Sequence, residues 1–159
     1  MDSSIVCGVD GSADSLKGVS VAAGLAERLG ARLVLAHIVD HTDVTSAVGP
    51  MGGAPAARPL LIDNLENLEQ AAEQLLVEVA DAAGLERAER RVAFGFAAQR
   101  LADVADDEEA ELIVVGSRGR GAFKAAFLGS VSTSLIGVAR CPVLVVPPAH
   151  HSEGAPAEL

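Results

Sequence analysis

Short apolar runs alternate along the chain with longer segments of helical periodicity. Continuous apolar runs are typical of strands buried on both faces, and they predict strands at residues 5–9, 33–39, 91–96, 112–115 and 143–146. Between the runs, apolar residues recur every three or four positions, which predicts helices over residues 12–29, 60–83, 98–109 and 130–139. The spacing in the first helix predicts an apolar face made of Leu16, Val19, Ala23, Ala26 and Leu29.

Strands alternating with helices indicate a parallel sheet covered on each side. We therefore expect an α/β domain with a doubly wound, five-stranded parallel sheet and helices on both faces, Rossmann-like, in the strand order 3-2-1-4-5. Such folds bind ligands beyond the carboxyl ends of their strands, where the strand order reverses. A functional site is accordingly expected in the loops that follow Val9, Val39 and Val115.

The chain is expected to form one domain over residues 1–148, followed by a disordered polar tail at 149–159. Residues 41–59 contain three of the seven prolines and a Gly-Gly pair, and we expect them to form a long mobile loop.

Composition restricts the class of function. Half of the 159 residues are hydrophobic, but Trp and Tyr are absent and the net charge is -10. A protein so acidic and so poor in aromatic residues is not expected to bind nucleic acid or an anionic membrane surface. The start of the chain lacks a basic segment, and no apolar run approaches ~20 residues, so a cytoplasmic protein is expected. Cys7 and Cys141 lie in apolar runs and are expected to be buried thiols in a reducing compartment.

Positive charge gathers in one region of this acidic chain. Residues 112–152 contain no Asp or Glu, but they contain Arg118, Arg120, Lys124 and Arg140. Buried elements often lack acidic residues, which is the simpler interpretation. It does not explain why three of the four basic residues lie between glycines.

A glycine-rich loop follows the most apolar strand. Gly116-Ser117-Arg118-Gly119-Arg120-Gly121 comes directly after residues 112–115, and Gly129-Ser130 opens the next helix. Glycine lets backbone N–H groups approach phosphate oxygens, and a helix N-terminus adds partial positive charge. Ser130 could cap the helix or donate to phosphate, and Ser132 and Thr133 supply further hydroxyls. The alternative is a glycine-rich turn with a purely structural role.

Two other phosphate-binding motifs do not fit. The dinucleotide signature belongs at the first strand–helix turn, where this chain has Asp10-Gly11-Ser12, and Lys124 is not placed as in a P-loop. Instead, the spacing of Gly116, Gly119 and Gly129-Ser130 resembles the ATP-binding signature of the universal stress protein family. The resemblance extends to Val9-Asp10-Gly11-Ser12, to His37-Ile38 and to Cys141–Val146. The chain departs from it at Gly95-Phe96-Ala97, where many members have a Gly-x-Pro turn.

The resemblance implies a role for each matching residue. Asp10 would contact the ribose and lie near a phosphate-bound Mg or Mn, the backbone of Ile38 would recognise adenine, and Gly116 would meet the ribose. Gly119, Gly129, Ser130 and Val131 would hold the phosphates of ATP. The complete candidate set is Asp10, Gly11, Ser12, Ile38, Gly116, Ser117, Arg118, Gly119, Arg120, Gly121, Gly129, Ser130, Val131 and Ser132. None of them is expected to be catalytic or to ligate a metal directly.

Other polar residues have simpler interpretations. Asp10 could also act as a base or cap the first helix, and capping combined with ribose contact is favoured over base chemistry. His37 is expected to be a hydrogen-bonded core residue. The acidic run 106–109 is expected to form a solvated face at a helix end.

Three functions agree with these observations. The favoured one is a nucleotide-dependent stress-response and signalling module that binds ATP. The alternatives are a slow Mg-dependent ATPase and a structural dimer with a vestigial loop. A homodimer through the last strand, Val143–Val146, is expected in each case, because an exposed edge strand needs covering and the family typically dimerises there.

Overall fold

The computed structural model describes residues 3–40, 58–119 and 128–148. The elements are β1 (Ser4–Gly8), α1 (Ala13–Leu29), β2 (Arg32–Val39), α3 (Arg58–Ala82), β3 (Glu89–Phe94), α4 (Ala97–Asp107), β4 (Ala110–Gly116), α5 (Ser130–Val138) and β5 (Val143–Val146). Every predicted strand and helix is present, in the predicted order. Residues 41–57 of the expected loop and the tail from position 149 lie outside the described residues. The prediction that residues 58 and 59 belong to the loop is wrong, because α3 begins at Arg58.

The five strands form one sheet in the order β3-β2-β1-β4-β5, and every neighbouring pair is parallel. This confirms the predicted fold class and strand order. β1 is central, with Val6 opposite Val34 of β2 on one side and Ile113 of β4 on the other. The strand order reverses between β1 and β4, so their carboxyl ends define the place where such sheets bind ligands.

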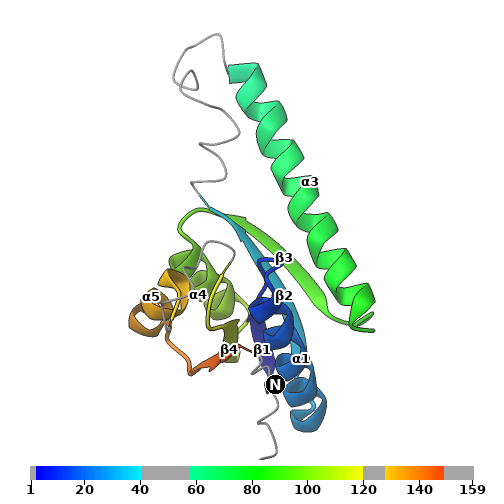
Figure 1. The fold of residues 1–159 in the computed structure, drawn as a ribbon, viewed down its shortest axis with the longest axis vertical. Helices are drawn as coiled ribbons and strands as arrows, with labels where there is room; N and C mark the ends of the chain where they lie inside the picture. The colour runs from blue at the N-terminus through cyan, green and yellow to red at the C-terminus, as the bar shows by residue number, and fades with distance from the viewer. Residues whose placement is uncertain (1–2, 41–57, 120–127, 149–159) are drawn as a thin grey trace, which may run out of the picture.

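Helices cover both faces of the sheet, with α1 and α3 on one side and α4 and α5 on the other (Figure 1). Successive side chains of a strand point to opposite faces, so Ile5 and Cys7 pack in the layer of α1 and α3 while Val6 packs in the layer of α4 and α5. In the first layer Leu76 anchors α3 and is fully buried, and in the second Leu135 does the same for α5.

The buried face of α1 differs from the predicted one. Leu16 is 42% exposed and Leu29 is 64% exposed, whereas the buried residues of the helix are Ser15, Gly18, Val19, Ala22 and Ala26. Small side chains prevail because α1 lies very close to the sheet. A Cβ atom on Gly116 of β4 would lie only 2.6 Å from the carbonyl carbon of Asp14 in α1. Helical spacing selected Leu16 and Leu29 for the buried face, but close packing against the sheet buries smaller residues instead.

β3 begins at Glu89 and ends at Phe94, whereas the prediction placed it at residues 91–96. Gly95 ends the strand with a φ of +137°, a conformation that favours glycine. The polar start was missed because β3 is an edge strand whose first residues belong to an ion-pair ring rather than to the apolar core.

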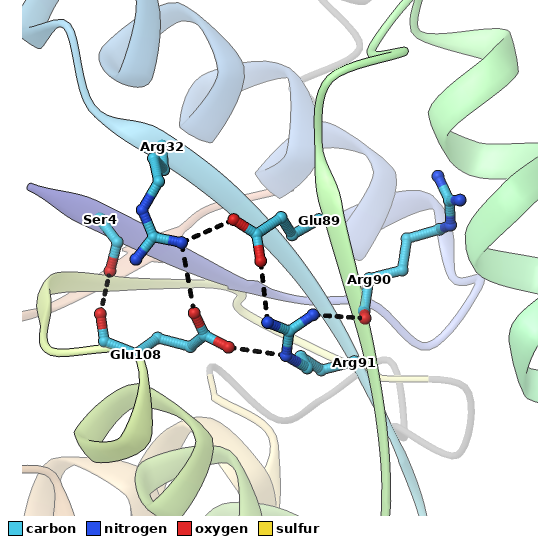
Figure 2. A network of polar contacts seen from close by, with 6 residues as sticks. All are labelled: Ser4, Arg32, Glu89, Arg90, Arg91 and Glu108. Carbon is cyan, nitrogen blue, oxygen red and sulfur yellow. Dashed lines mark hydrogen bonds and ion pairs between the residues drawn. The ribbon is translucent and has the colours of Figure 1, made fainter. Parts of the chain in front are cut away.

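This ring closes the amino-terminal edge of the sheet (Figure 2). Arg32 Nη1 lies 2.6 Å from Glu89 Oε1 and 3.4 Å from Glu108 Oε2, and Arg91 contacts the same two carboxylates at 2.8 and 2.6 Å. Ser4 Oγ donates to the carbonyl oxygen of Glu108 at 2.7 Å. Hydrogen bonds from Arg32 and then Arg91 hold the pKa of Glu89 below its ordinary value, and the Glu89 contact raises the pKa of Arg32. The ring ties β1, β2 and β3 to the end of α4.

The prediction that residues 106–109 form a solvated face is wrong for Glu108, whose side chain is only 11% exposed within the ring. Asp106, Asp107 and Glu109 are exposed as predicted, and Asp106 pairs with the exposed Arg140 at 3.1 Å. The partners of Glu108 come from β2 and β3, so neighbouring residues in sequence could not reveal them. No helix in the described part of the chain is long and apolar enough to cross a membrane.

Candidate functional site

The turn after β1 forms one side of the candidate site. Asp10 Oδ1 accepts a hydrogen bond from the Ser12 backbone N–H at 2.9 Å, and Gly11 adopts a φ of +80° to make this turn. Ser12 is the N-cap of α1, and its Oγ accepts from the Ser15 N–H at 3.2 Å. The expectation that Asp10 caps the helix is wrong, because Asp10 lies two residues too early and holds the capping residue instead.

β4 ends in direct backbone contact with α1. A Cβ atom on Gly116 would lie 2.6 Å from the carbonyl carbon of Asp14 and 2.8 Å from the nitrogen of Ser15. Real Cβ atoms essentially never come so close to backbone, so only glycine permits this approach. The loop that follows Gly116 is thereby placed against the first turn of α1.

Three predicted residues converge beyond these strand ends. A Cβ atom on Gly119 would lie 2.7 Å from Asp10 Oδ2, and one on Gly129 would lie 3.6 Å from the backbone nitrogen of Gly119. The Gly129 N–H donates to the Ser117 carbonyl oxygen at 2.7 Å, which joins the two ends of the glycine-rich loop. Backbone and one carboxylate thus lie together with little side-chain bulk between them.

α5 begins at this point with its first amides directed out of the helix. Its N-cap is Gly129, so the prediction that Ser130 caps the helix is wrong, and Ser130 is the first helical residue. Among the described residues no side chain caps α5, and its first turn contains no acidic residue. Ser130 and Val131 are exposed. Uncapped amides and the helix dipole together favour a negatively charged group at this end.

The hydroxyl groups of the predicted site mainly brace the loop. Ser132 Oγ donates to the Gly116 carbonyl oxygen at 2.9 Å, and Thr133 Oγ1 donates to that of Gly129 at 2.9 Å. Ser117 is buried, and its Oγ donates to Asp14 Oδ2 at 3.2 Å.

Arg118 forms an ion pair with Asp14, a residue that the sequence interpretation did not select. Arg118 Nε lies 3.1 Å from Asp14 Oδ2, and the two side chains are 29% and 13% exposed. Ser12 Oγ also donates to the Arg118 carbonyl oxygen at 3.4 Å. The sequence shows only that Asp14 is an acidic residue near the start of the helix after β1, and this feature alone does not identify its partner.

The remaining predicted residues lie further out or outside the description. Ile38 stands at the carboxyl end of β2, one strand away from β1, and pairs with Ala93 of β3. Next to it, His37 is buried with Nδ1 2.6 Å from the Val9 carbonyl oxygen, which confirms the expected core histidine. Arg120, Gly121 and Lys124 lie outside the described residues.

The described residues offer neither a metal-binding cluster nor a reactive buried thiol at Cys7. The described residues contain no group of three or more His, Cys, Asp or Glu side chains that could hold a metal ion. Burial raises the pKa of the Cys7 thiol to about 12, so this thiol stays protonated near neutral pH. Cys141 is only partly buried, contrary to expectation. Its pKa is raised mainly by burial and secondly by the negative charge of Asp106. The candidate site therefore offers backbone donors, the Asp10 carboxylate and the start of α5, while the Asp14 carboxylate is paired with Arg118.

The fold and the site together define a doubly wound α/β domain with a glycine-rich loop at the switch point of its sheet. The sequence profile of the universal stress protein family matches residues 1–147. A universal stress protein of Thermus aquaticus is 32% identical over 146 residues, covering 92% of this chain and 99% of that protein. A universal stress protein of Mycolicibacterium smegmatis is 34% identical over 145 residues, covering 89% of this chain and 47% of that longer protein. The chain belongs to the universal stress protein family.

Solved structures share this fold. Hypothetical protein MJ0577 superimposes with a TM-score of 0.74 at 21% identity, covering 94% of this chain and 99% of that one, which shows a shared fold. A universal stress protein in complex with cAMP superimposes with a TM-score of 0.61 at 26% identity, covering 92% of this chain and 98% of that one.

Proposed function

We propose that this chain binds ATP at the carboxyl edge of β1 and β4 and acts as a nucleotide-dependent stress-response and signalling module. The observation that carries the proposal is the convergence of Gly119, Gly129 and Asp10 at the switch point of the sheet. The family relative solved with cAMP supports an adenine nucleotide as the class of ligand.

The chemistry of the site suits phosphates held by backbone. Gly119 and Gly129 keep side-chain bulk away from the loop, and the uncapped start of α5 supplies N–H groups at Ser130 and Val131. In this proposal those four residues hold the phosphates, as the family signature implies. The ribose lies against Asp10 and Gly116, and the adenine meets the backbone of Ile38 at the end of β2.

A Mg or Mn ion would accompany the phosphates rather than occupy a protein cage. Mg²⁺ commonly uses one or two carboxylates together with phosphate oxygens and water. Asp10 fits a place near such an ion, because its Oδ2 lies 2.7 Å from a Cβ built on Gly119, where the phosphates are proposed to bind. Its negative charge would offset part of the charge of the cation.

A homodimer through β5 and a cytoplasmic location complete the proposal. β5 is an edge strand of the sheet, and Val143, Leu144 and Val145 are only partly buried in a single chain. Pairing of this edge with a second copy would satisfy its backbone groups. Equilibrium sedimentation should then give twice the chain mass, and a monomer at high concentration would contradict the dimer.

The test of nucleotide binding uses an unusual property of the chain. Without Trp or Tyr the protein absorbs near-ultraviolet light weakly, so a bound adenine dominates the near-ultraviolet spectrum of the purified protein. We expect heat denaturation to release ATP at about one molecule per chain, or titration with Mg-ATP to give a saturable heat signal. Release of ADP alone would indicate the slow ATPase instead. A protein that contains no nucleotide and gives no heat signal would overturn the proposal.

Two Gly→Ala variants provide a matched comparison. Alanine at Gly119 must displace Asp10 Oδ2, which lies 2.7 Å from the new Cβ, and we expect ATP affinity to fall by about tenfold or more. Gly24, in the middle of α1, has no atom within 4 Å of a new Cβ, so its alanine variant should bind normally. Unchanged binding by Gly119→Ala would show that the phosphates lie elsewhere.

A further inference from the structure

Asp14 bridges the two segments that form the candidate site. It is the second residue of α1, and its carboxylate accepts from Ser117 Oγ at 3.2 Å and from Arg118 Nε at 3.1 Å. The acceptor is largely shielded, since the Asp14 side chain is only 13% exposed. An ion pair shielded from water is stronger than one on the open surface, so this contact restrains the loop effectively.

The same pair changes the charge that the loop presents. Sequence alone assigned Arg118 to the positive charge that would face an anion. In the structure its guanidinium adjoins a carboxylate, so the pair carries no net charge. Phosphates approaching Gly119 and Gly129 therefore meet backbone N–H groups beside a neutral pair.

Asp14 contacts Ser117 and Arg118, the two residues that directly precede Gly119 and determine its position. Ser117 accepts the Gly129 N–H at 2.7 Å, and the Arg118 carbonyl oxygen accepts from Ser12 Oγ at 3.4 Å. Displacing either residue moves Gly119 relative to Asp10 and Gly129. A binding loop held in place beforehand loses less conformational entropy when the ligand binds.

We propose that Asp14 is a positioning residue of the nucleotide site: it fixes Ser117 and Arg118 so that Gly119 is preset for the phosphates, and Arg118 acts through this pair rather than by touching the phosphates. The inference rests on the proposed function, because it names the residue that organises the same site.

The test compares Asp14→Ala, Arg118→Ala and the double variant by calorimetric titration with Mg-ATP. Each single change should weaken binding by about tenfold, the cost of ordering one or two loop residues on binding. The double variant should be no weaker than either single variant, because both changes break the same contact. Asp14→Asn, which keeps an oxygen acceptor, should restore affinity to within about threefold.

Asp103→Ala is the matched control, since it removes another Arg–Asp pair, 2.9 Å long, on the surface of α4. It should leave affinity unchanged. The inference is overturned if Asp14→Ala binds ATP as tightly as the unmodified chain, or if the losses of the single variants multiply in the double variant. The latter result would mean that Arg118 contacts the phosphates directly.

A second measurement needs no nucleotide and so separates this inference from the proposed function. Backbone amides of residues 117–119 should exchange hydrogen about tenfold faster in ligand-free Asp14→Ala than in the unmodified chain or in Asp103→Ala. If the unmodified chain binds no ATP, the proposed function fails, and exchange still decides whether Asp14 fixes the loop. Equal exchange in all three proteins overturns the positioning role.

Discussion

The contact between Gly116 and the first turn of α1 makes a strong prediction about stability. Alanine at this position would place its Cβ 2.6 Å from the carbonyl carbon of Asp14 and 2.7 Å from its oxygen. Ordinary contact begins at 3.4 Å, so the two backbones must separate by 3.4 minus 2.6, or about 0.8 Å. Neither can yield easily, because β4 is paired on both sides and α1 is packed on the sheet.

The expected cost follows from this displacement. Overpacking a core typically costs about 1–3 kcal/mol, and the upper half of that range applies where both partners are backbone. For a domain of this size, 1 kcal/mol corresponds to about 2–4 °C in Tm. We therefore expect Gly116→Ala to lower the free energy of unfolding by about 2–3 kcal/mol and the Tm by about 5–10 °C.

Gly24→Ala is the control for the same chemical change. A Cβ there meets no atom within 4 Å, and alanine in a helix interior is favoured over glycine by about 0.8–1.0 kcal/mol. Both variants should be unfolded in urea and followed by far-ultraviolet circular dichroism, since the chain has no Trp or Tyr for fluorescence. If Gly24→Ala is stabilised while Gly116→Ala stays within about 0.5 kcal/mol of the unmodified chain, the inferred close approach of α1 and β4 is wrong.

Three further predictions concern other parts of the molecule. Glu109 has a φ of +49°, so Glu109→Gly should raise the free energy of unfolding in urea by about 0.5–1 kcal/mol; a loss would show that the backbone is unstrained. Because burial raises the pKa of Cys7 from 9.0 to about 12, the stability that this thiol contributes is complete below about pH 9 and is lost between about pH 9 and 12. Cys7→Ala should flatten that decline, and native Cys7 should resist iodoacetamide at mildly alkaline pH until urea is added. Since Arg32 lowers the pKa of Glu89, the stability from this pair is present above about pH 4.5 and is lost as the pH falls further. Glu89→Gln should reduce that acid sensitivity slightly, and molar salt should reduce the difference between the two proteins.

Much of the fold could be predicted from sequence because the central strands are apolar on both faces. Residues 5–9, 33–39 and 112–115 could be recognised without knowing their neighbours. β3 begins two residues earlier than predicted because Glu89 looks like a loop residue unless its partner Arg32, at the start of β2, is known. Hydrophobicity identifies a core strand, but it does not define the boundary of an edge strand whose polar groups are paired.

The same distinction separates the site residues that could be predicted from those that could not. Gly116, Gly119 and Gly129 could be found because glycine is easily recognised in a sequence and the spacing of the three glycines matches a known signature. The role of Asp14 could not be found in this way, and neither could the exchange of capping roles between Asp10 and Ser12. The role of a carboxylate depends on the group that it faces. In Asp14 that group is Arg118, which is 104 residues further along the chain.

The central position of β1 has a consequence for when the site comes into existence. β1 can pair with β2 as soon as the first 40 residues are made, but its other edge has no partner until β4 is available. Contacts between residues so distant in sequence close large loops and form late in folding. Asp10 follows β1 and Gly119 follows β4. A chain interrupted before β4 can therefore contain α1 and α3 and still lack the site. A ligand that binds at this site stabilises only the fully folded domain, by mass action, and does not stabilise partly folded chains that lack the site.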